Sequence, residues 1–239
     1  MIALFRSEFL KLRTTRTAVV LALALLVVTA MAIVGPLVLA DSLDASLQQD
    51  LITAATFAVL FSLLFGTLVM TGDFRHGTAT PTFLVTPKRE HVLYAKILAA
   101  AAGGLVLSVA ALVLVYAVAI PWLLIGGHEI YLFQEGPVRA ALATAAAAAL
   151  WGALGVGLGA LVRSQVGAIV GALVWFLILE GLVGALWDDA APYLPGAAIG
   201  ALAGDSSDLS SAAGAAVSLA YAAAFCLAGT LLTARRDVT

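Results

Sequence analysis

Residues 72–96 read GDFRHGTATPTFLVTPKREHVLYAK and lie between two long apolar runs. The run before them, 51–71, and the run after them, 97–120, contain no charged residue. The polar stretch itself holds four of the 12 lysines and arginines of the chain. A charged segment between two membrane spans has to lie in water, and basic loops gather on the cytoplasmic side. The stretch therefore predicts a cytoplasmic loop between two spans.

The composition indicates an integral membrane protein. The chain is 63% hydrophobic and 11% charged, with a mean hydropathy of +1.09, whereas soluble domains have about 25% charged residues. The single cysteine, Cys226, excludes a disulfide framework and a cysteine-based metal site. The basic residues are few and lie at the ends of apolar runs, so we expect no binding of nucleic acid.

The order of apolar and polar segments predicts an all-α integral membrane protein. Residues 1–17 place apolar residues at helical spacing and basic residues between them, which favours an amphipathic helix in the membrane interface over a plain flank of the first span. Residues 18–239 are expected to form one six-helix transmembrane domain. The predicted spans are about 18–40, 51–71, 95–120, 139–162, 167–187 and 212–234.

The distribution of positive charge predicts the orientation. With both termini inside, eleven of the 12 lysines and arginines fall on inner segments and only Arg139 falls outside. This bias predicts cytoplasmic termini. A helix that starts near Pro87 and runs to residue 120 is longer than the bilayer, so its first turns, with Lys88, Arg89 and Lys96, are expected to project into the cytoplasm.

Small residues and outer segments complete the prediction. Gly155-x-x-x-Gly159 and Gly167-x-x-x-Gly171 both predict close backbone approach, within one chain rather than between subunits. Residues 121–137 are expected to form an outer loop. Residues 188–211 are also expected outside, and their small-residue run, 196–204, is expected to enter the membrane as a helical hairpin covered by protein.

Residues that would support enzyme chemistry are missing from the pattern. No lysine follows the glycine of a phosphate-binding loop, so we expect no ATP binding by this chain. Nor is there a Gly-x-Ser-x-Gly turn or a pair of carboxylates within one span. Glu180 is the intramembrane ionisable residue, and it has two open interpretations: a contact for substrate or proton, or a structural hydrogen bond to a neighbouring helix.

Four segments together resemble small six-span permeases of the type-2 ABC exporters. They are SEFLKLRTTR at 7–16, DFRHGT at 73–78, TFLVTPKR at 82–89 and YLPG at 193–196. The likeness extends over the whole chain in order and span count, although many members carry Glu where this chain has Asp73.

The resemblance implies a bacterial cytoplasmic membrane protein that pairs with a second permease chain, identical or different. Each permease would bind a separately encoded ABC ATPase subunit, two copies in all, and these subunits would bind ATP and Mg²⁺. Residues 1–17 would be the elbow helix, the segment around 73–85 would hold the coupling helix, and 188–211 would be the re-entrant hairpin near the exit.

The predicted coupling contact combines an apolar cluster with charges at its rim. Exposed apolar side chains in a polar loop favour a partner surface, although the same cluster would also suit an anchor in the lipid interface. A membrane anchor that recruits a cytoplasmic partner without transport is the alternative function, and a secondary transporter is disfavoured because no inverted repeat is visible. The coupling residues are Asp73, Arg75, His76, Phe83, Leu84, Val85, Lys88 and Arg89.

Overall fold

The computed structural model describes residues 15–40, 42–75, 89–203 and 209–235. In this part of the chain, six helical segments are long and apolar enough to cross a membrane. They confirm the predicted all-α class and span count, and the protein is a multi-pass membrane protein. Their bounds are Arg16–Leu39, Ala45–Asp73, His91–Ile125, Glu135–Val162, Gln165–Leu186 and Ser211–Thr233.

The first span is α2, Arg16–Leu39, and the second combines α3, Ala45–Thr53, the 3₁₀ turn η1, Ala54–Thr56, and α4, Phe57–Arg75. The third and fourth spans are α6, Arg89–Ile125, and α7, Glu135–Val162. The fifth combines α8, Gln165–Val174, the π-helical turn η2, Trp175–Leu179, and α9, Glu180–Leu186. After the 3₁₀ turn η3, Ala191–Tyr193, and the short helix α10, Pro195–Ala203, the sixth span is α11, Ser211–Arg235. The predicted interfacial helix falls almost wholly outside the described residues.

The third span is longer than predicted at its C-terminal end. Helix α6 continues through Pro121, the predicted start of a loop, and ends at Ile125. Proline removes one backbone donor, and neighbouring helices and local adjustments make this tolerable in a membrane helix. Beyond the helix end, His128 N donates to Leu123 O at 2.9 Å. The connection to α7 is therefore shorter than the predicted loop 121–137.

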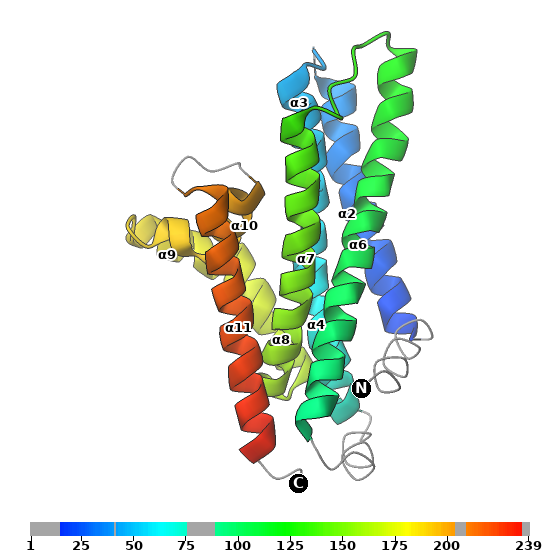
Figure 1. Ribbon diagram of the computed structural model, residues 1–239. Helices are drawn as coiled ribbons and strands as arrows, with labels where there is room; N and C mark the ends of the chain where they lie inside the picture. The colour runs from blue at the N-terminus through cyan, green and yellow to red at the C-terminus, as the bar shows by residue number, and fades with distance from the viewer. Residues whose placement is uncertain (1–14, 41, 76–88, 204–208, 236–239) are drawn as a thin grey trace.

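Helix α7 lies at the centre of the bundle and packs on α4, α6 and α11 (Figure 1). The backbones of α7 and α4 approach each other so closely that no side chain fits between them at two glycines. A Cβ added at Gly66 would lie 1.9 Å from Gly152 O, and one added at Gly155 would lie 2.2 Å from Leu63 O. Close van der Waals contacts of this kind stabilise helix association in a membrane, because the hydrophobic effect contributes little between helices that are surrounded by lipid.

The two ends of the bundle differ in charge. The described chain ends, the two ends of the segment 76–88 and the turn between α7 and α8 all lie at the lower end in Figure 1. We call it the basic end, because Arg16, Arg75, Arg89, Arg163 and Arg235 belong to the helix ends found there. Arg163 ends α7 in the left-handed conformation with φ 55°, and Ser164 Oγ caps α8 by accepting from Gly167 N at 3.2 Å.

The fifth span is not straight. Helix α8 rises from the basic end, η2 widens the helix for one turn, and α9 then runs crosswise to the bundle (Figure 1). Helices α9 and α10 stop well short of the level that α3 and α7 reach in that view. Helix α10 packs on α11 and α7. Residues 196–203 of the small-residue run are thus helical, and the insertion of the run into the membrane stays a prediction.

Candidate functional site

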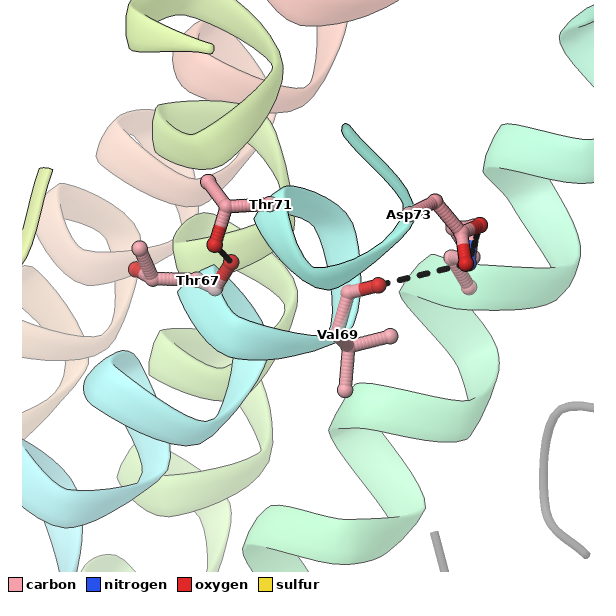
Figure 2. Close-up of polar contacts among 5 residues, drawn as sticks. Thr67, Val69, Thr71 and Asp73 are labelled. Carbon is pink, nitrogen blue, oxygen red and sulfur yellow. Dashed lines mark hydrogen bonds and ion pairs between the residues drawn. The ribbon is translucent and has the colours of Figure 1, made fainter. Parts of the chain in front are cut away.

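The basic ends of α4 and α6 are joined by a buried ion pair, Asp73 with Lys96. Lys96 Nζ lies 2.7 Å from Asp73 Oδ2, and the two side chains are 3% and 16% exposed. Lys96 Nζ also donates to Val69 O at 3.3 Å. In Figure 2, Asp73 points from α4 toward α6. A buried ammonium group needs such partners, since an unpaired charge is costly away from water.

The side chain of Lys96 is buried between α4 and α6. The reason is geometric: Asp73 and Val69 are four residues apart on α4, so they share one face of that helix and present two acceptors to α6. The expectation that the first turns of this span project into the cytoplasm stays a prediction.

Arg75 makes a second connection from the same end of α4. Its Nη1 donates to Gln165 Oε1 at 3.2 Å, and Gln165 is the first residue of α8. The last turn of α4 therefore contacts α6 through Asp73 and α8 through Arg75. Both residues precede the segment 76–88, so the turn that leads into that segment contacts two neighbouring spans.

The interior of α4 above this end is polar without being charged. Thr71 Oγ1 donates to Thr67 O at 2.7 Å (Figure 2). Thr67 Oγ1 donates to Leu63 O at 2.9 Å. Both threonines are buried. By donating to the preceding turn, their hydroxyls are satisfied inside the helix, and their small size leaves room for α7 to approach.

The remaining predicted coupling residues are placed as follows. Arg89 begins α6. His76, Phe83, Leu84, Val85 and Lys88 lie outside the described residues, so the apolar cluster and its partner surface stay predictions. Asp73 and Arg75 belong to helix α4 rather than to a loop, and both have contacts within the chain.

Glu180 begins α9 and faces the start of α10. Its Oε1 accepts hydrogen bonds from Gly196 N and, at 3.2 Å, from Ala197 N. These are backbone groups that a helix leaves without partners in its first turn, and a carboxylate there is favoured by the helix dipole. Of the two interpretations left open by the sequence, the hydrogen bond to a neighbouring helix is the one that this geometry supports.

Gln48 is a buried polar residue that the sequence pattern did not single out. Its side chain is fully buried at the end of the bundle opposite the basic end. Nε2 donates to Leu43 O at 2.9 Å and to Glu129 O at 2.8 Å, and Oε1 accepts from Tyr131 N at 2.7 Å. The amide thus joins α3 to the α6–α7 connection. Only tertiary contacts reveal this, because the partners are backbone groups far along the chain.

Hydrogen bonds shift the pKa values of two ionisable side chains outside the spans, Asp44 and Tyr131. The backbone N–H of Leu47, with the hydroxyl of Ser46, lowers the pKa of the Asp44 carboxyl at the start of α3. The hydrogen bond that Tyr131 donates to the Glu129 carboxylate raises the pKa of Tyr131. In the described ranges, no group of three His, Cys, Asp or Glu side chains is arranged to hold a metal ion.

The chain matches no protein-family model and no curated protein.

Proposed function

We propose that this chain is the permease subunit of an ATP-driven ABC exporter, moved by a separate ATPase subunit that binds the 73–89 segment. The observation that carries the proposal is the double attachment of that segment. Asp73 pairs with Lys96 on α6, and Arg75 bonds to Gln165 on α8. A partner that binds differently in its ATP and ADP states would therefore bias the arrangement of three spans at once.

The membrane context is consistent with this role. Six apolar helices supply the spans, and the basic residues at the shared end of the bundle favour a cytoplasmic location for the termini and the 73–89 segment. The host membrane would be the bacterial cytoplasmic membrane. ATP and Mg²⁺ would be bound by two ATPase copies rather than by this chain.

A second permease chain is part of the proposal. The motif Gly167-x-x-x-Gly171 on α8 has no close interhelical contact in the described chain: a Cβ at Gly171 would meet nothing within 4 Å. In membranes, such small-residue faces allow another helix to approach closely. This free face supports pairing of two permease chains along α8.

The test is ATPase capture by the purified chain. A candidate ABC ATPase subunit is mixed with the chain in detergent, and binding is measured by pull-down with and without ATP. Phe83→Ala is expected to weaken capture more than Lys88→Ala, because burial of an apolar side chain contributes about 1.5–3 kcal/mol against about 0.2–1 for an exposed charge pair.

Detergent removes the bilayer and so separates the two interpretations of the apolar cluster. If Phe83→Ala folds normally and captures the ATPase as well as the parent does, the cluster is a lipid anchor and the coupling assignment is wrong. Absence of capture by the parent chain would favour the alternative, a membrane anchor without transport. ATP-driven export from reconstituted vesicles would exclude that alternative.

A further inference from the structure

The fifth span is the most loosely held of the six described spans. In its most apolar 18-residue window, 11% of the residues are buried, which is the lowest share of any span. The buried residues of α8 are two alanines, Ala168 and Ala172, whose side chains do not interlock with a neighbouring helix. Helix α9 packs mainly on η2 and η3, its neighbours in sequence. Few buried apolar contacts mark the parts of a protein that move at low free-energy cost.

Helix α8 lies between two points where the chain can bend. At the basic end, Arg163 ends α7 in the left-handed conformation and Ser164 caps α8, so a two-residue turn joins the span to the centre of the bundle. At the other end, η2 is a π-helical turn in which the N–H of Glu180 donates to Trp175 O. Hinges are formed by short element-terminal segments of this kind, and π-helical turns occur often at functional sites.

The carboxylate of Glu180 fastens the far end of this span to α10. Its Oε1 accepts from Gly196 N and, at 3.2 Å, from Ala197 N. Gly196 leaves room for the carboxylate, because a Cβ there would lie 2.7 Å from Glu180 Oε1. Helix α10 is itself fixed on α11, since a Cβ added at Gly214 would lie 2.6 Å from Leu202 N. Glu180 therefore joins the loosely held span to a closely packed helix pair.

An aromatic contact holds the same region against α7 and borders a groove. Phe176 of η2 meets Trp151 edge to face, with ring centroids 5.0 Å apart, and both rings line the groove between α7, α8 and α11. Three buried polar atoms here have no hydrogen-bond partner among the described residues: Trp151 Nε1, Trp175 Nε1 and Glu180 Oε2. Buried polar groups without partners lower stability. They therefore reduce the free-energy difference between this closed arrangement and an open one in which polar groups reach them.

We propose that Glu180 is the latch of a movable fifth span. While its carboxylate holds the start of α10, the span closes the groove. When this contact is released, α8 and α9 swing away from α7 and α11 about the turn at 163–164, and the groove widens. Glu180 is a positioning residue in this device, because it acts on α10 and not on a cargo. The hydrogen bond of Arg75 to Gln165 lies next to the pivot, so the last turn of α4 contacts the moving span at its foot.

The test measures distances between pairs of spin labels by pulsed electron paramagnetic resonance, on the purified full chain in nanodiscs. Cys226→Ala removes the single cysteine, so that labels attach only at introduced cysteines. The moving pair is Leu186→Cys on α9 with Leu219→Cys on α11, and the control pair is Val106→Cys on α6 with Leu142→Cys on α7. All four positions are exposed. The control pair reports on the closely packed part of the bundle.

The latch is broken from either side. Glu180→Leu removes both hydrogen bonds and should raise the population with a longer distance in the moving pair about tenfold or more, as expected for the loss of hydrogen bonds to a charged group. Gly196→Ala should act in the same direction, because its Cβ occupies the space of the carboxylate. Gly200→Ala is the matched control on the same helix, where a Cβ meets nothing within 4 Å, and it should match the parent.

Glu180→Gln keeps an acceptor oxygen without the charge, so its population should fall between those of the parent and of Glu180→Leu. The control pair should keep one unchanged distance in every variant. If Glu180→Leu does not fold, Gly196→Ala and Glu180→Gln carry the test.

A moving pair that keeps the parent's distance distribution in folded Gly196→Ala and Glu180→Leu would overturn the proposal. Equal broadening of both pairs would overturn it too, because it would show a general loosening of the bundle instead of the release of one span. The inference does not depend on the ATPase partnership, since no ATPase is present in the experiment. Its failure would leave the proposed function untouched, and a failure of ATPase capture would leave the latch untouched.

Discussion

Two adjacent helices carry the same small-residue motif, and the structure uses the two motifs differently. On α7, a Cβ at Gly155 would lie 2.2 Å from Leu63 O, and one at Gly159 would lie 2.9 Å from Met70 Cβ. On α8, a Cβ at Gly167 would meet only the neighbouring residues Ser164 and Val162, and one at Gly171 would meet nothing within 4 Å. The prediction of close approach within the chain is thus confirmed for α7, and α8 differs from it.

The difference extends to the whole spans. In the most apolar 18-residue window of each span, 56% of the residues are buried in the fourth span and 11% in the fifth. The lesson is that a small-residue motif permits a close contact but does not choose the partner. Helix α4 packs on the glycine face of α7. The glycine face of α8 stays exposed and could contact lipid, a ligand or another chain.

The largest expected effect tests this contrast directly. Gly155→Leu should prevent recovery of folded, monodisperse protein, because even a Cβ there overlaps the backbone of α4. Gly171→Leu, the same substitution in the sister motif, should fold with a melting temperature close to that of the parent. Size-exclusion chromatography and thermal unfolding in detergent measure both. Equal behaviour of the two variants would contradict the contrast.

The next effect concerns the buried ion pair of the densely packed side. Asp73→Asn should lower the free energy of unfolding by about 3–5 kcal/mol, since it leaves the charge of Lys96 buried without its carboxylate. Adding Lys96→Met should restore much of the loss, because no buried charge then remains at that position. The measurement is denaturant unfolding in detergent. A double variant as unstable as the single one would show that packing, and not charge pairing, governs this end.

A smaller effect compares two glutamines with different surroundings. Gln48→Leu should cost about 1–3 kcal/mol, because it leaves the part-buried backbone groups at Glu129 and Tyr131 without this partner. Gln165→Leu removes an exposed hydrogen bond to Arg75 and should cost less than about 0.5 kcal/mol. Both are measured by the same unfolding experiment. If Gln165→Leu lowered the free energy of unfolding more than Gln48→Leu, the hydrogen bond at the basic end would be the stronger of the two.

The smallest effect is a pH dependence at the exposed start of α3. The pKa of Asp44 is lowered in the folded chain, mainly by the N–H of Leu47, so its capping contribution is complete above the unfolded-state pKa of about 3.9. The contribution is lost as the pH falls through the lower folded-state value. Asp44→Asn keeps an acceptor at every pH. Its melting temperature should therefore fall less steeply than that of the parent on acidification, and equal slopes would rule out this role.

The sequence by itself determined the spans and much of their placement. Long apolar runs have to form helices in a bilayer, since every backbone group needs a partner inside the segment. For this reason the six predicted spans agree with the described helices within a few residues, apart from the starts of the second, third and fourth spans and the end of the third. The loop expected at 121–137 was misplaced because a proline ends a helix in water more reliably than in a packed membrane bundle.

Only the tertiary structure decided which residues meet. The burial of Lys96, the hydrogen bonds of Gln48 and the contact of Glu180 with α10 all join segments distant in the chain. Local pattern carries no information on such partners, because the choice depends on how whole helices cross and on the space left between them. The same reason separates the two glycine motifs: composition made both helices able to pack closely, and the position of α4 decided that α7 did so.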